Sequence, residues 1–149
     1  MKRYVRLEPG EPPKGVFMDF VEKRKKDFEQ VFELVRCKSA IAVPRGAALS
    51  RYAVVKGQSR ISENVLVAQR AYLEDAWLGV GSNAQENCYI IRSVLEGKNI
   101  TAHGGKIINA QLGEGVFVGF NAFLHGTPEC SLGIGKGSIV MPHTIIDLK

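Results

Sequence analysis

Blocks of six residues, each with the same order of apolar and small positions, recur from residue 41 onward. The first position of a block is aliphatic and the fifth is small or β-branched, as in Leu112-Gly-Glu-Gly-Val-Phe. Strands of an ordinary sandwich alternate with a period of two and need no small fifth residue. The six-residue rule therefore predicts a parallel β-helix, in which each first-position side chain points into a narrow core. The blocks begin at Ile41, Ala47, Ala53, Ile61, Val67, Leu73, Leu112, Val118, Leu124, Ile134 and Val140, with a two-residue slip before Ile61.

Three blocks make one coil, which predicts about 18 residues per coil and about six coils over residues 41–147. Such coils stack at the strand spacing of about 4.8 Å. Glycine after the aliphatic residue, as at Gly113, Gly119 and Gly135, is expected to suit the turn at each corner. The side chains expected to point inward are those of Ile61, Val67, Leu73, Leu112, Val118, Leu124, Ile134 and Val140.

The N-terminal part follows another pattern. Residues 1–13 are polar and rich in Pro and Gly, which predicts a tail. Residues 14–37 carry apolar side chains at spacings of three and four, which predicts an amphipathic helix. The basic run at 23–26 is interpreted as a solvated face of that helix. The β-helix domain is then expected to occupy residues 41–149.

Composition excludes several classes of protein. A length of 149 residues indicates one domain, and 45% hydrophobic with 23% charged residues excludes wholesale disorder. No apolar run reaches the roughly 18–20 residues of a membrane span, and the start lacks the features of a secretory signal. The net charge of +5 comes without a nucleic-acid-binding motif. Cys37, Cys88 and Cys130 show no CxxC spacing. We therefore expect a cytoplasmic protein with reduced, packed thiols and no nucleic-acid or membrane partner.

The repeats resemble those of the hexapeptide-repeat family, whose β-helix is left-handed. The resemblance implies a mainly β fold, namely a left-handed parallel β-helix, to which the pattern adds one N-terminal α-helix. Proteins of this family are commonly homotrimers with active sites in clefts between subunits. Phe117, Phe120 and Phe123 are too many aromatic residues for the exposed faces of a small β-helix. We expect a homotrimer with at least one of these rings at the subunit interface.

Two phrases resemble the gamma-class carbonic anhydrases more closely. One begins Asn83-Ala-Gln-Glu, and in that class such a phrase leads to the first metal-binding histidine. The other is Val118-Gly-Phe-Asn-Ala-Phe-Leu-His-Gly. It corresponds to the motif that, in the gamma class, supplies the second and third metal-binding histidines. The resemblance covers roughly residues 61–147 and implies a zinc or iron ion that forms hydroxide near neutral pH. It makes Gln85, Glu86 and His125 candidate catalytic residues, with His125 a metal ligand.

The metal-binding pattern is incomplete, because Ile91 and Phe120 stand where two of the three histidines belong. A catalytic zinc normally has three protein ligands, so the ordinary site is not assembled. His103 precedes Phe120 by close to one coil, and from one subunit it could approach His125 of the next as a second ligand. Alternatively, His103 simply sits in an exposed turn before Gly104-Gly105. We expect no tightly bound metal, negligible CO2 hydration, and a cleft that is empty or holds a small molecule or anion.

Three functions remain open, and with them the question of whether the chain is an enzyme. The first is a gamma-carbonic-anhydrase-like homotrimer with a degenerate metal site between subunits. The second is an acyltransferase of the same fold, with His103 or His125 deprotonating an amine or hydroxyl acceptor. Against it, the repeats run almost to Lys149, which leaves little room for the extended last coils usual in such transferases. The third is a non-catalytic trimeric scaffold. A fold alone supplies no substrate.

Overall fold

The structure is a computed structural model that describes residues 43–149. The tail predicted at 1–13, the helix predicted at 14–37 and Cys37 lie outside the described residues. Among the described residues, no helix is long and apolar enough to cross a membrane.

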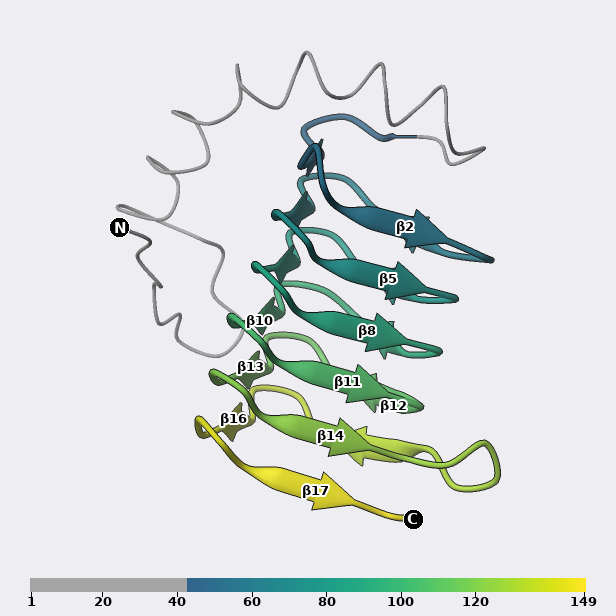
Figure 1. Ribbon diagram of the computed structural model, residues 1–149, viewed down its shortest axis with the longest axis vertical. Helices are drawn as coiled ribbons and strands as arrows, with labels where there is room; N and C mark the ends of the chain where they lie inside the picture. The colour runs from purple at the N-terminus through teal and green to yellow at the C-terminus, as the bar shows by residue number, and fades with distance from the viewer. Residues whose placement is uncertain (1–42) are drawn as a thin grey trace.

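The described residues contain seventeen short strands, each of two or three residues, joined by turns (Figure 1). They are β1 (Ala48–Leu49), β2 (Val54–Lys56), β3 (Arg60–Ile61), β4 (Leu66–Val67), β5 (Tyr72–Glu74), β6 (Trp77–Leu78), β7 (Asn83–Ala84), β8 (Tyr89–Ile91), β9 (Val94–Leu95), β10 (Ile100–Thr101), β11 (Lys106–Ile108), β12 (Ala110–Leu112), β13 (Phe117–Val118), β14 (Phe123–His125), β15 (Leu132–Ile134), β16 (Ile139–Val140) and β17 (Ile145–Asp147).

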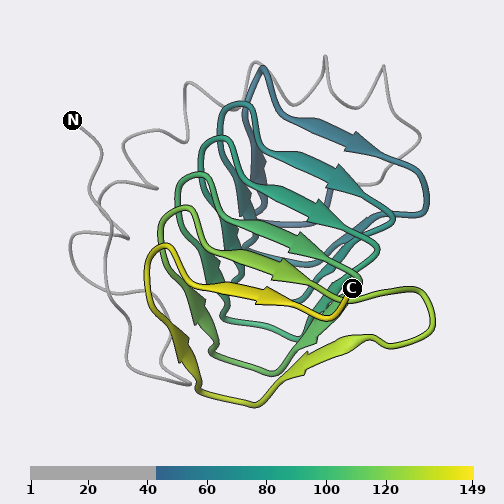
Figure 2. The same ribbon diagram turned by 60° about the horizontal axis from the view of Figure 1, so that its bottom comes forward.

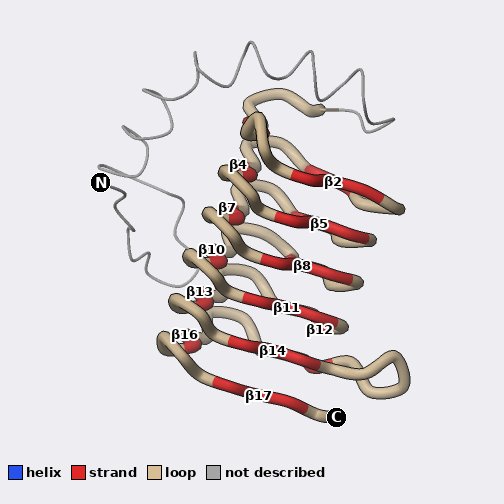
Figure 3. The backbone as a smooth tube through the Cα atoms, viewed as in Figure 1, coloured by secondary structure: helices blue, strands red, loops and turns tan. Residues whose placement is uncertain are grey.

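Every third strand pairs in parallel, which produces three sheets that the chain visits in turn. Sheet A has the order β1-β4-β7-β10-β13-β16, sheet B has β17-β14-β11-β8-β5-β2, and sheet C has β15-β12-β9-β6-β3. In Figure 1 the front strands of sheet B run to the right while each later coil lies lower, so the winding is left-handed. Figure 2 shows the three-sided outline, and Figure 3 shows that strands and turns alternate without a helix in the described residues. The predicted left-handed parallel β-helix is confirmed.

The core consists of side chains that stack on their counterparts in the next coil. On sheet B, Leu73, Ile90, Ile107 and Leu124 follow one another in register, and none is exposed to solvent. This stacking removes apolar surface from water continuously along the axis, at roughly 25 cal/mol per Å². Of the predicted inward residues, Ile134 is partly buried against the core. The others are buried, namely Ile61, Val67, Leu73, Leu112, Val118, Leu124 and Val140.

The regular coil is one residue shorter than predicted. Equivalent positions in successive coils are 17 apart in the chain, as for Ser59 and Ala76, whose side-chain hydroxyl and backbone N–H are hydrogen-bonded. The missing residue is on the side between sheets B and C, where the inward residues Leu73 and Leu78 are five apart. The first coil has six residues on this side, from Val55 to Ile61, and the next coil has five. The core requires only that inward positions coincide from coil to coil, so the two lengths are both tolerated. With six strands in two sheets and five in the third, the chain completes about five turns.

The register predicted for the first coil is wrong by two residues. Leu49 and Val55 point inward there, while Ala47 and Ala53 occupy the small corner positions that Val65 and Ala71 occupy one coil later. A six-residue step therefore runs unbroken from Leu49 to Leu73, and the slip before Ile61 does not exist.

The corners of the regular coils each carry a residue with positive φ. Between sheets A and B these residues are Arg70, Asn87, Gly104, Asn121 and His143. Glycine and asparagine tolerate this conformation, whereas for other side chains the left-handed region costs about 1–2 kcal/mol. Positive φ accounts for four of the six asparagines and seven of the fourteen glycines in the described residues.

Gly113 and Gly119 do not supply these positive φ values, contrary to the prediction. A Cβ at Gly113 would lie 2.6 Å from the backbone nitrogen of Lys136, and one at Gly119 would lie 2.5 Å from that of Pro142. Glycine is needed at these two positions because the next coil passes too close for a side chain. Gly135 also lacks a positive φ, and a Cβ there would meet no atom closer than 3.9 Å.

Replacing Arg70 by Asn should stabilise the protein, because Arg70 holds φ 59° without the tolerance of asparagine. We expect a gain of about 1 kcal/mol, seen as a rise of a few degrees in the thermal midpoint. The reverse change at the equivalent corner, Asn87→Arg, should lower the midpoint. An unchanged or lower midpoint for Arg70→Asn would contradict this account of the corners.

Replacing Val118 by Asp should prevent folding. Val118 is fully buried between Thr101 and Val140 of the neighbouring coils, and a carboxylate there has no partner. Gln111→Asp places the same group on an exposed outward position and serves as control. Circular dichroism of both variants measures the result, and a folded Val118→Asp protein would refute the assignment of the core.

Candidate functional site

A histidine and an aspartate meet at the end of sheet B. His125 ends β14 and Asp147 ends β17, and the two are partners in the parallel register. Nδ1 of His125 lies 3.0 Å from Oδ1 of Asp147. Because a carboxylate only accepts hydrogen bonds, Nδ1 is the donor in this contact, and in the neutral imidazole the lone pair is then on Nε2. The arrangement orients an imidazole for accepting a proton at Nε2.

Asp147 is held in its ionised form. Its carboxylate accepts a hydrogen bond from the backbone N–H of Lys149 at 3.0 Å. This bond, followed by the contact with His125, keeps the pKa of Asp147 below its usual value. The His125 side chain is about one fifth exposed. A partly exposed imidazole beside a carboxylate is an arrangement that suits a general base.

An insertion in the last complete coil brings the two residues together. At the regular coil length the neighbour of His125 would be residue 142, but the interval here is 22 residues. The extra residues form the loop 126–131, which projects from the corner between sheets B and C (Figures 1 and 2). Asn109 holds both ends of the loop: its side-chain amide donates to the carbonyl of Gly126, and its carbonyl accepts from the N–H of Leu132.

The surroundings of His125 on the outer face of sheet B are mostly apolar. The Phe123 ring lies on the same strand, with its centroid 5.4 Å from that of the imidazole. Ile108 pairs with His125 in the preceding coil. Ile145, which pairs with Phe123 in the following coil, is 73% exposed. The outer face around His125 therefore carries apolar side chains beside the charged Asp147, which pairs with it in the following coil.

Gln85, Glu86 and His103 lie elsewhere in the same chain. Gln85 and Glu86 are buried at the corner between sheets A and B, and His103 occupies that corner one coil later. The N–H of Gly104 donates to the carbonyl of Glu86, which fixes this adjacency. His125 pairs with Ile108, which lies five residues beyond His103, on the other side of the corner at Gly104.

Within one chain, therefore, the structure brings together three of the four predicted site residues and separates His125 from them. His103 is half-buried rather than in a fully exposed turn. Whether a neighbouring subunit places its His103 against His125 stays a prediction.

The gamma-class ligand positions do not converge within the chain. Ile91 and His125 share one column of sheet B, but Ile108 lies between them. Two coils separate their backbones by about 10 Å, whereas zinc ligands lie about 2 Å from the metal. Over residues 43–149, no group of three or more His, Cys, Asp or Glu residues is placed to hold a metal ion.

The sequence patterns indicated neither Asn109, which anchors the loop, nor Asp147, which orients His125. The signal for Asp147 was present, because its pairing with His125 follows once the shorter repeat and an insertion at 126–131 are recognised.

The prediction of packed cysteine thiols is half right. Cys88 is buried, and burial raises its pKa, but Cys130 is exposed in the loop.

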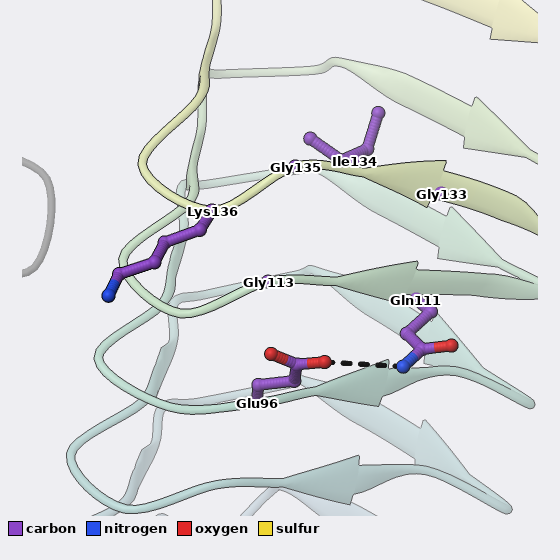
Figure 4. Close-up of a pocket in the computed structure, with 7 residues that line it drawn as sticks. All are labelled: Glu96, Gln111, Gly113, Gly133, Ile134, Gly135 and Lys136. Atoms are coloured by element: carbon purple, nitrogen blue, oxygen red, sulfur yellow. Dashed lines mark hydrogen bonds between the residues drawn. The ribbon is translucent and has the colours of Figure 1, made fainter.

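A shallow cavity of about 360 Å³ lies on the outer face of sheet C, near the C-terminal coils (Figure 4). Its polar groups are Glu96, Gln111 and Lys136, and the Gln111 amide donates to the Glu96 carboxylate at 3.2 Å. Its floor contains Gly113, Gly133 and Gly135, so no side chain fills it there. β15, which contributes to this floor, directly follows the loop that begins beside His125. The volume is within the range of small-molecule sites.

No protein-family model and no curated protein matches the chain. A solved structure that is similar is described as a "putative acetyltransferase" from Desulfovibrio desulfuricans G20, with 57% identity and a TM-score of 0.71. The match covers 98% of this chain but 29% of the other, so this chain spans less than a third of that protein's length. The description is of a transferase, and the closeness to gamma-class carbonic anhydrases is not confirmed.

Proposed function

We propose that this chain contributes to acyl transfer from a thioester donor to an amine or hydroxyl acceptor. His125 is the general base, and Asp147 is the residue that positions it. The observation that carries the proposal is the 3.0 Å contact between His125 Nδ1 and Asp147 Oδ1, which leaves Nε2 as a proton acceptor. The similar structure described as an acetyltransferase supports the same class of reaction.

The reaction balances with these two residues and the substrates alone. Nε2 of His125 takes the proton of the acceptor as its nitrogen or oxygen attacks the carbonyl carbon of the thioester. The carbon–sulfur bond then breaks, and the imidazolium returns the proton to the leaving thiolate. The products are the acylated acceptor and a free thiol, and Asp147 remains ionised throughout. Its negative charge stabilises the imidazolium that forms between the two steps.

The two substrates are assigned to the two sides of the loop 126–131. The acceptor lies on sheet B, where His125 and Phe123 face outward. The thioester donor lies toward sheet C, where the cavity over Gly113, Gly133 and Gly135 leaves room for an extended chain.

Acyl transfer is preferred to CO2 hydration on the same observations. The base function needs one histidine and its carboxylate, and both are present at hydrogen-bond distance. Metal-dependent hydration needs further histidines where Ile91 and Phe120 stand.

Substitution of His125 tests the proposal. With acetyl-coenzyme A and a panel of primary amines and alcohols, His125→Ala should lower kcat by about 10²–10⁴-fold, the usual contribution of a general base. Asp147→Asn should lower kcat less and leave KM for the donor unchanged, because Asp147 touches only the base. Acetylated product is measured by mass spectrometry, since exposed Cys130 would react with thiol reagents.

His143→Ala is the matched control, because His143 lies at an exposed corner in the same part of the chain. It should retain the wild-type rate. Equal rates for wild type and His125→Ala, or no product with any acceptor, would contradict the proposal.

We also propose that the chain assembles as a homotrimer through its outer apolar side chains. Phe120 is exposed, Phe117 and Phe123 are partly buried, and Val54, Tyr89 and Ile145 are exposed on sheet B. An interface here would bury these rings and set His125 in a cleft between subunits. Light scattering at micromolar concentration should return three times the chain mass of 16.3 kDa. Phe123→Asp should reduce it, and a stable monomer for the wild type would refute the assembly.

A further inference from the structure

A single lysine interrupts an otherwise aliphatic and aromatic column on the outer face of sheet B. The residues of this column lie in register from β2 to β17 (Figure 1) and are Val54, Tyr72, Tyr89, Lys106, Phe123 and Ile145. Lys106 is exposed, and its neighbours in register are Tyr89 in the coil before and Phe123 in the coil after. Tyr89 and Ile145 are 41% and 73% exposed, so this face is open to a ligand.

Lys56, at the other end of the same face, shows how a lysine is held here by the protein itself. Its Nζ lies 3.6 Å from Oε1 of Glu74 and 5.2 Å from the centroid of the Tyr72 ring. The contact with the Tyr72 side chain, followed by the charge of Glu74, raises the pKa of Lys56. The positive charge of Lys56 is therefore compensated within the chain.

Lys106 has the aromatic contact but lacks the carboxylate. Its Nζ lies 5.9 Å from the centroid of the Tyr89 ring. The column that begins with Lys56 and Glu74 continues with Ile91 and Ile108, so an aliphatic residue stands where an acid would compensate Lys106. Among residues 43–149, no ion pair includes Lys106. Its ammonium is thus an uncompensated positive charge among apolar side chains, where an ion pair is stronger than in open water.

Lys106 and His125 project from the same outer face, one coil apart. Lys106 and Ile108 begin and end β11, and Ile108 pairs with His125 of β14. Two residues along a strand and one step between strands place the Cα atoms of Lys106 and His125 about 8 Å apart. Asp147 pairs with His125 from the other side, so its Cα is about 12 Å from that of Lys106 and its charge does not compensate the ammonium.

Resting on the proposed acyl transfer, we propose that Lys106 selects an acceptor that carries an oxyanion, a carboxylate or a phosphate, a few bonds from its reacting amine or hydroxyl group. The oxyanion pairs with Nζ of Lys106 while the amine or hydroxyl group meets Nε2 of His125. The aliphatic part between them packs on Phe123 and Ile108, which are the residues in register with Lys106 and His125. Lys106 is then a specificity-determining residue, because it contacts the end of the acceptor that does not react.

Matched acceptors separate the role of the anion from transfer itself, using the full chain. 4-Aminobutyrate is compared with its primary amide, and O-phosphoethanolamine with ethanolamine, each with acetyl-coenzyme A as donor. Mass spectrometry measures the acetylated product, and calorimetry measures binding of the same four compounds without donor. We expect kcat/KM to be about tenfold higher for an acceptor with the anion than for its counterpart without it, as is usual for one charge-assisted contact. The pair with the larger ratio identifies whether a carboxylate or a phosphate is preferred.

Variants of Lys106 test whether this side chain is the source of the preference. Lys106→Gln should remove the preference without lowering kcat/KM for the amide, and Lys106→Arg should keep it. Lys106→Glu should reverse it, so that 1,4-diaminobutane becomes a better acceptor than 4-aminobutyrate. Lys56→Gln removes the same charge three coils away and is the matched control, with the preference unchanged.

A preference for the anion that is lost in Lys106→Gln and kept in Lys106→Arg supports the proposal. Equal kcat/KM with and without the anion, or a preference that Lys106→Gln retains, overturns it and leaves acyl transfer by His125 standing. If no compound is acetylated, the proposed function fails, and binding decides the role of Lys106. Anion-dependent binding that Lys106→Gln abolishes still supports a site at Lys106, whereas binding that ignores the anion overturns that site as well.

Discussion

The structure depends on one constraint: each inward side chain must stack on the equivalent side chain of the next coil. The stacked column buries Leu73, Ile90, Ile107 and Leu124 without gaps, and it is the main source of favourable free energy in so narrow a molecule. A residue gained or lost within a strand would turn its outward side chains into the core. Changes of coil length are therefore confined to the corners, where the first coil has one residue more than the next and the loop 126–131 is inserted.

The same constraint decides which residues can form a site. Any side chain in the regular part has its neighbours exactly one coil before and after it in the chain, so chemistry requires two suitable residues at that interval. His125 would meet residue 142 on that rule, and it meets Asp147 only because the loop 126–131 lengthens the coil. The insertion does not disturb the core, since the inward Leu124 and Ile134 remain in their columns. A loop at a corner is thus the least costly way for this fold to change the partner of an outward residue.

The fold could be predicted from sequence because side chains that stack between coils must recur at a fixed spacing along the chain. Aliphatic residues at every sixth position allow few alternatives, and the left-handed winding came from resemblance to a family. The five-residue side could not be predicted, because its corners at Asp75, Arg92 and Asn109 carry no apolar signal. The candidate site was less accessible. His125 was identified, but Gln85 and Glu86 were grouped with it on a sequence motif, and His103 on an assumed coil length and a neighbouring subunit. Counting by the observed coil length places Gln85, Glu86 and His103 at one corner of the chain, apart from His125 of the same chain.

Positions that break the six-residue repeat are not explained by the stacking of side chains between coils. Consistent local choices favour one fold, and natural proteins break them mainly at functional positions. Two departures stand out in the described residues: the insertion at 126–131, and Asn83 in an otherwise apolar column. The first brings a histidine into close contact with a carboxylate at the edge of sheet B. The second, together with Gln85, leaves three buried polar atoms without partners. The insertion does not help the coils to stack, and the contact it creates is the basis of the proposed acyl transfer.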